Sequence, residues 1–197
     1  MVIDQSSLFV ASGICAAALA LTMLIVWLNS RADHFLVGWM AGMLLLGSGV
    51  ILYTMVPPQD TLLTALAFAM EVVGFVIVLA AARMFTGASA RTGVFVVLGL
   101  VTLLLTVPPI VAGYDGLGIM IYNFIAGMLL LATAGQYWDA RREAPCSIAA
   151  MTVLYVLAAL SFMACGAVLL HEADWVLAGR PDNWAEQFNA IMCIAGI

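Results

Sequence analysis

The chain has 197 residues, of which 65% are hydrophobic and only 9% are charged. Because an ordinary globular domain carries about 25% charged residues, this composition excludes a water-soluble fold and favours an integral membrane protein. The net charge is −5 and the sequence contains no lysine, which excludes nucleic-acid binding, since that requires clustered basic side chains.

Apolar stretches of about 20 residues, the length of a transmembrane helix, follow one another along the chain. Six complete spans are predicted at 8–28, 35–55, 61–82, 93–111, 117–138 and 147–170. A seventh span, 184–197, is incomplete, because as a helix it reaches only about 20 Å. We therefore expect an all-α polytopic transmembrane bundle in which residues 1–197 form one domain. The intact protein is expected to continue into a cytoplasmic output domain outside this sequence.

Arginines are distributed unevenly between the connections. The connections after the first, third and fifth spans contain Arg31, Arg83, Arg91, Arg141 and Arg142, whereas the other side has only Arg180. Basic residues in short loops mark the cytoplasmic side of a membrane. The pattern predicts a bacterial inner-membrane protein with a periplasmic N-terminus and cytoplasmic arginine-bearing loops. The short connections also favour an up-and-down bundle in which sequence neighbours are spatial neighbours.

Glu71 is the main candidate for a functional residue, because it lies near the centre of the third span. An ionisable group at that depth is costly and marks a functional site facing the bundle interior. Asn123 in the fifth span and Ser161 in the sixth are its nearest polar candidates by depth. Together they suggest a ligand pocket or a proton-sensitive switch. The alternative interpretation is a purely structural hydrogen bond between helices.

Small residues suggest close helix packing at two positions. Gly38 and Gly42 form a GxxxG pattern in the second span, and Gly74 lies one turn from Glu71 in the third. This spacing allows either close packing within the chain or formation of a homodimer.

No pattern of catalytic or cofactor-binding residues is found in the sequence. Walker, nucleophile-elbow and zincin motifs do not occur, so no catalytic residue is assigned and no cofactor is expected in this chain. His171, Glu172, Asp174 and Asp182 gather near one loop, but they lack a recognised ligand spacing. We interpret them as a solvated acidic loop and predict no metal site.

Two stretches carry a family resemblance. Residues 32–87, ending in Ala82-Arg83-Met84-Phe85-Thr86-Gly87, and the segment QYWDARRE at 136–143 resemble the N-terminal membrane region of bacterial transmembrane diguanylate cyclases. The resemblance implies a C-terminal GGDEF domain that makes cyclic di-GMP from GTP with Mg²⁺ as a dimer. No GGDEF sequence is present here, so GTP and Mg²⁺ are expected only if such a domain follows.

The function predicted from these features is a sensory or regulatory input module embedded in the lipid bilayer. A stimulus such as a lipid, a quinone or another small hydrophobic molecule would shift helix packing. A second hypothesis is a non-catalytic accessory subunit that binds partner subunits of a larger membrane complex. A third is a small transporter or channel built around Glu71.

Overall fold

The computed structural model describes residues 5–29, 31–57, 60–89, 91–142 and 144–171. In this part of the chain there are six α-helices and no strand: α1 (Gln5–Asn29), α2 (His34–Met55), α3 (Thr61–Phe85), α4 (Thr92–Val111), α5 (Asp115–Asp139) and α6 (Pro145–His171). All six are long and apolar enough to cross a membrane. Each predicted complete span lies inside one of them. The all-helical fold is thereby confirmed for the described residues, and the six apolar helices suggest a multi-pass membrane protein. The predicted seventh span, 184–197, lies outside the described residues.

Local signals at the helix ends explain why the helices begin and stop where they do. The side chain of Asp60 caps the start of α3, where Oδ1 accepts a hydrogen bond of 3.0 Å from the backbone N–H of Leu63. Gly87 follows the end of α3 and Gly113 follows the end of α4, with positive φ angles of 73° and 86°. Glycine adopts this conformation without a steric penalty, so the chain can turn sharply after each helix.

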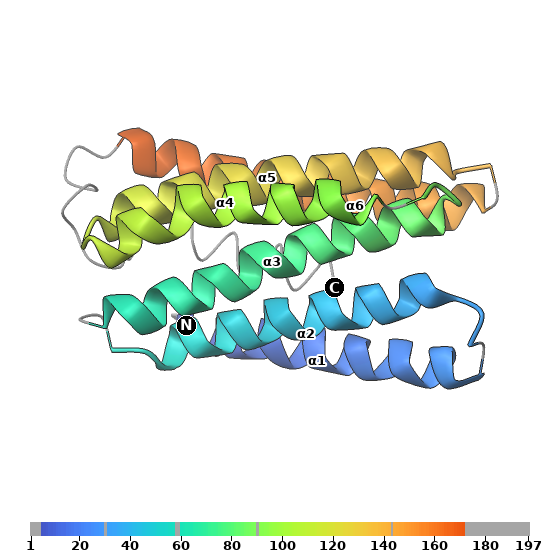
Figure 1. The fold of residues 1–197 in the computed structure, drawn as a ribbon, viewed down its shortest axis with the longest axis horizontal. Coiled ribbons are helices and arrows are strands. Elements are labelled where there is room, and N and C mark those ends of the chain that lie inside the picture. The colour runs from blue at the N-terminus through green and yellow to red at the C-terminus, as the bar shows by residue number, and fades with distance from the viewer. Residues whose placement is uncertain (1–4, 30, 58–59, 90, 143, 172–197) are drawn as a thin grey trace.

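Helix α3 lies at the centre of the bundle. Figure 1 shows it running obliquely between α1 and α2 on one side and α4, α5 and α6 on the other. Every pair of consecutive helices is in contact, as predicted for an up-and-down bundle, and α3 also contacts α5. In the most apolar stretch of each helix, 61% of the residues are buried in α3 and α5 but only 17% in α4. The two central helices are the ones that carry Glu71 and Asn123.

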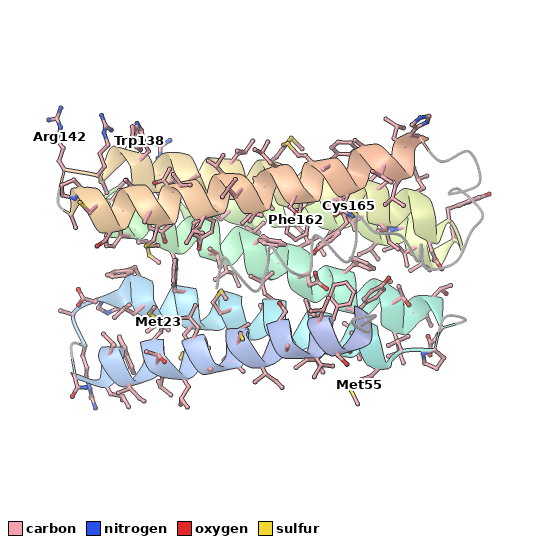
Figure 2. The ribbon with its side chains drawn as sticks, turned by 180° about the vertical axis from the view of Figure 1, so that it is seen from behind. Met23, Met55, Trp138, Arg142, Phe162 and Cys165 are labelled. Carbon is pink, nitrogen blue, oxygen red and sulfur yellow. The ribbon has the colours of Figure 1, made fainter. Side chains whose placement is uncertain are left out.

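The outer surface of the helices is strongly apolar, as contact with lipid requires. On α4, Val94, Val97 and Leu104 are 58%, 59% and 69% exposed. Figure 2 shows Met55 at the edge of the bundle, and its side chain is 76% exposed. These faces suggest contact with the lipid bilayer.

Glycines set the close crossing of α2 and α3. A Cβ atom added to Gly42 would lie 3.0 Å from the carbonyl oxygen of Gly74, and one added to Gly74 would lie 2.9 Å from that of Gly42. A Cβ on Gly38 would lie 3.1 Å from Cβ of Ala81, so the GxxxG pattern faces α3 within the same chain. This arrangement corresponds to the first of the two alternatives, packing within the chain.

A second glycine crossing, between α1 and α2, was not predicted. Added Cβ atoms on Gly13 and Gly47 would each lie 3.0 Å from the other residue's carbonyl oxygen. The backbones of α1, α2 and α3 therefore approach one another closely, so these helices form a tightly packed group.

The alternation of helix direction brings the arginine-bearing connections to one end of the bundle. The connections after α1, α3 and α5 lie there, and Figure 2 shows Arg142 projecting from that end beside Trp138. The guanidinium group of Arg141 lies 4.5 Å from the centroid of the Trp138 ring, a distance typical of a cation–π contact.

Candidate functional site

Glu71 is held by a hydrogen bond between the two central helices. Its side chain is buried, with 6% of its surface exposed, and Oε2 accepts a hydrogen bond from the hydroxyl of Tyr122 on α5. Room for the carboxyl side chain comes from Gly49 on α2, where an added Cβ would lie 2.6 Å from Cγ of Glu71. Three helices therefore cooperate to accommodate one acidic residue.

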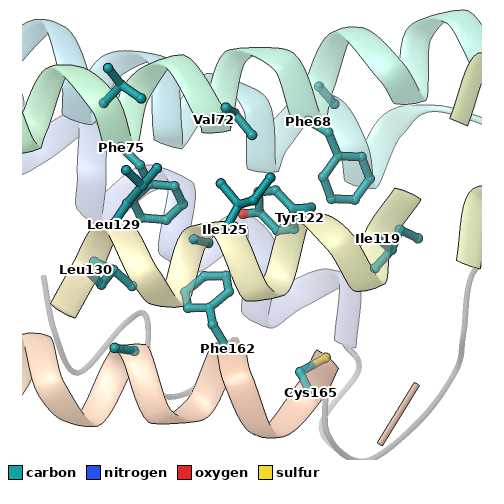
Figure 3. Packing of buried hydrophobic residues seen from close by; sticks show 14 of the residues in the cluster. Phe68, Val72, Phe75, Ile119, Tyr122, Ile125, Leu129, Leu130, Phe162 and Cys165 are labelled. Carbon is teal, nitrogen blue, oxygen red and sulfur yellow. The ribbon is translucent and has the colours of Figure 1, made fainter. Parts of the chain in front are cut away.

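Aromatic rings surround this hydrogen bond and connect five of the helices. Edge-to-face contacts run from Phe9 to Tyr53, from Tyr53 to Phe68, from Phe68 to Tyr122, from Tyr122 to Phe162 and from Phe162 to Phe75, with ring centroids 4.7 to 6.0 Å apart. Figure 3 shows Phe68 and Phe75 reaching from α3 towards α5, and Phe162 pointing from α6 towards the same region. Such pairs add stabilisation beyond that of buried area alone.

Two adjoining cavities lie beside the Glu71–Tyr122 pair. The larger has a volume of about 100 Å³ and the smaller about 50 Å³. Both are lined by Ser12, Val50, Glu71, Tyr122 and Phe162. The larger cavity extends to Tyr155 and Ala158 on α6, and the smaller one extends to Asn123. Most of the lining is apolar, and three polar residues, Ser12, Glu71 and Tyr122, line both cavities.

Asn123 lines the smaller cavity and is 3% exposed. Its Nδ2 donates a hydrogen bond of 2.8 Å to the carbonyl oxygen of Ile119 one turn earlier. Its Oδ1 has no hydrogen-bond partner among the described residues. Glu71 and Asn123, both singled out in the sequence, therefore line the same cavity.

Ser161, the third sequence candidate, does not join them. Its side chain is also 3% exposed, but it lines neither of the two cavities beside Glu71. The position next to it, Phe162, lines both. The side chain of Ser161 therefore points away from the cavities, whereas that of its neighbour Phe162 points towards them.

The cavities lie where two groups of helices are separated. Among the described helices, no Cα atom of α6 lies within 8 Å of a Cα atom of α1 or α2. Side chains bridge this separation instead: Tyr155 of α6 packs against a buried cluster to which α1, α2 and α3 all contribute, namely Ala16, Ala20, Met43 and Val78. A region joined by side chains can repack more easily than the glycine crossing of α2 with α3.

Sequence reasoning missed several residues of this site, namely Ser12, Gly49, Tyr53 and Tyr122. A signal existed for Tyr122, because a buried carboxyl group requires a donor and Tyr122 precedes Asn123 at a matching depth. Within the described ranges, no cluster of three or more His, Cys, Asp or Glu side chains could hold a metal ion. Glu172, Asp174 and Asp182 of the acidic loop lie outside those ranges, so their interpretation stays a prediction.

Comparisons with protein-family models, with curated proteins and with solved structures found no match. The resemblance to the membrane region of diguanylate cyclases therefore stays a prediction from the sequence. Support for a function comes instead from the geometry around Glu71.

Proposed function

We propose that this chain is a sensory or regulatory membrane module whose stimulus is a small hydrophobic molecule that binds in the cavities beside Glu71. The observation that carries the proposal is the position of these cavities. They lie between α5 and α6 on one side and the glycine-packed group of α1, α2 and α3 on the other. Helix α6 reaches that group through side chains alone. A molecule bound there contacts both sides of the separation.

Ligand binding at this position can act as a switch because it contributes differently to two packings. A ligand shifts an equilibrium only if it binds one state more tightly than the other. A packing in which α6 stands away from α1 and α2 leaves room for the ligand, whereas a collapsed packing does not. Occupancy therefore favours the spaced packing, and the ends of α2 and α6 move relative to each other.

The arginine-bearing end of the bundle is the natural output end in this proposal. Arginines gather there, which supports a cytoplasmic location of that end and an external N-terminus in a bacterial inner membrane. A cytoplasmic domain attached to the bundle, or a partner subunit, would sense the movement. The family resemblance makes a cyclic di-GMP-forming domain the first candidate for this output.

Filling the larger cavity with a side chain tests the proposal without knowledge of the ligand. Ala158 lines the cavity, whereas Ala164 on the same helix is exposed on the outer surface. Spin labels at Cys146 and at His34→Cys, with the other cysteines replaced by alanine, report the distance between α6 and α2 at the arginine-bearing end. Double electron–electron resonance in nanodiscs then compares Ala158→Phe with the control Ala164→Phe.

We expect Ala158→Phe to move the labels into a second distance population and Ala164→Phe to leave the original population unchanged. A second cavity-filling variant on the opposite wall, Val50→Phe, should have the same effect as Ala158→Phe. If the labelled parent protein and the three variants all gave the same distance distribution, with the bundle still folded, occupancy of the cavity would not control helix packing.

A further inference from the structure

The orientation of the Asn123 amide defines what the smaller cavity can bind. The carbonyl oxygen of Ile119 accepts hydrogen bonds and cannot donate them, so the NH₂ group of Asn123 must face it, at 2.8 Å. The amide oxygen then points the other way, buried and without a partner among the described residues. A buried acceptor left unpaired is costly, so this position calls for a donor.

The nearby hydroxyl of Tyr122 does not serve as that donor, because it donates to Glu71. Ser12, Tyr53 and Cys165 also line the wall, but none of them donates to this oxygen. The rest of the wall is largely apolar and includes Phe68, Ile119 and Phe162. A water molecule usually needs two to four polar partners, and apolar cavities of about 150 Å³ stay dry and take up aromatic molecules. The adjoining larger cavity is likewise mostly apolar. The site therefore combines one unpaired acceptor on a lining residue with room for an apolar body.

We infer that the ligand of this site is a lipophilic molecule with a hydroxyl group, and that this hydroxyl donates a hydrogen bond to Oδ1 of Asn123. This inference rests on the proposed function and names its ligand class. The apolar body of the ligand occupies the cavities beside Phe162, and the polar end lies at Asn123. Phenols, fatty alcohols and quinols belong to this class.

Molecules of the same shape without a donor are disfavoured by the same geometry. A ketone, an ether or a quinone carries oxygen acceptors, which would face the amide oxygen of Asn123 and leave it unpaired. A site that uses a hydrogen bond to a ligand hydroxyl rejects analogues lacking it, because its own buried polar group is then unsatisfied. The site therefore distinguishes a quinol from the corresponding quinone.

A matched pair of probes tests this inference. 4-Hexylphenol carries the hydroxyl, whereas 4-hexylanisole replaces the hydroxyl hydrogen with a methyl group. The full chain is placed in nanodiscs, and each compound competes with radiolabelled 4-hexylphenol, with empty nanodiscs as the blank. We expect the phenol to bind about tenfold more tightly than the anisole, as the loss of one buried hydrogen bond implies.

Two variants of Asn123 and one control test whether the preference for the phenol depends on the Asn123 amide oxygen. Asn123→Leu and the smaller Asn123→Ala should reduce the preference for the phenol to less than about twofold, a direct consequence of removing the acceptor. Thr133 is a matched control, because it lies on the same helix, is 1% exposed and already donates to the carbonyl of Leu129 at 2.8 Å. Thr133→Val should keep the full preference.

The outcomes separate the two proposals. Equal binding of phenol and anisole to the wild-type protein would overturn the donor requirement and leave the proposed function standing. A preference that persists in both Asn123 variants would overturn the donor requirement in the same way. Saturable binding of neither probe would overturn the binding site itself, whereas tight phenol binding without a change of helix packing would contradict only the switch.

Discussion

At the scale of single residues, the central feature is a buried carboxyl group whose partner comes from another helix. Glu71 on α3 and Tyr122 on α5 are 6% and 4% exposed. The hydrogen bond between them satisfies one carboxyl oxygen in a region where water is scarce. It also fixes α3 and α5 to each other beside the cavities, so that any ligand enters a preformed polar corner.

A double-mutant cycle measures how strongly this pair contributes. Tyr122→Phe removes the donor, and we expect it to lower the free energy of unfolding by about 0.6 kcal/mol, the average for a hydrogen bond between membrane helices. In a Glu71→Leu background the same substitution should cost almost nothing. Tyr114, which is 45% exposed, provides the control Tyr114→Phe. A coupling energy of zero in the cycle would mean that the two side chains are not paired.

Glu71 and Asn123 could be predicted from the sequence because each is a polar residue within an apolar stretch. Tyr122 and the position of Ser161 could not be predicted equally well. Spans that are apolar on all faces carry little periodicity, so the pattern gives the depth of a residue but not the direction in which it points. Only the packing of α5 against α3 shows that Tyr122 faces Glu71. Likewise, only the orientation of α6 in the bundle shows that Ser161 lies away from the cavities.

At the scale of helices, hydropathy predicted the six described elements to within a few residues. The glycine contacts were predicted in part. The Gly38–Gly42 pattern pointed to a close approach, and the structure pairs it with α3. The Gly13–Gly47 crossing of α1 and α2 was missed because Gly13 has no second glycine at GxxxG spacing. Its accompanying small residues, Ala16 and Ala20, are both buried and were the available signal.

Substitutions of glycine by alanine test the close packing of α2 against α3. An added methyl group at Gly42 would lie 2.7 Å from Cγ2 of Val78 and 3.0 Å from a backbone oxygen. We expect Gly42→Ala to lower the free energy of unfolding by about 1–3 kcal/mol, as overpacking of a core does. At Gly99 on α4 no atom would lie within 4 Å of the methyl group, so Gly99→Ala should be neutral or stabilising. Reversible unfolding in detergent measures the free energy of unfolding of both variants. Equal values for Gly42→Ala and Gly99→Ala would show that Gly42 does not lie at a close helix contact.

At the scale of the whole molecule, the chain direction and the arginine distribution together predict an orientation. The contact of α3 with α5 and the separation of α6 from α1 and α2 could not be predicted, because short loops specify only consecutive neighbours. These non-consecutive relations create the cavities. The site is therefore a property of the assembled bundle rather than of any single span.

Cys146 offers a test of the orientation in cells. It is exposed at the start of α6, at the arginine-bearing end. In a variant whose other cysteines are replaced by alanine, we expect a membrane-impermeant maleimide to label Cys146 in inverted membrane vesicles but not in intact spheroplasts. A Cys146→Ala protein gives the background. Labelling in spheroplasts would reverse the predicted topology and place the arginine-bearing end outside.

Control of helix packing by a bound ligand can be tested by following the packing while the cavities fill. The distance between labels at Cys146 and His34→Cys is measured by double electron–electron resonance as 4-hexylphenol is added to the full chain in nanodiscs. We predict a second distance population that grows with the same half-saturation as phenol binding and does not respond in Ala158→Phe. An unchanged distance distribution at saturating, demonstrably bound phenol would contradict the proposed switch.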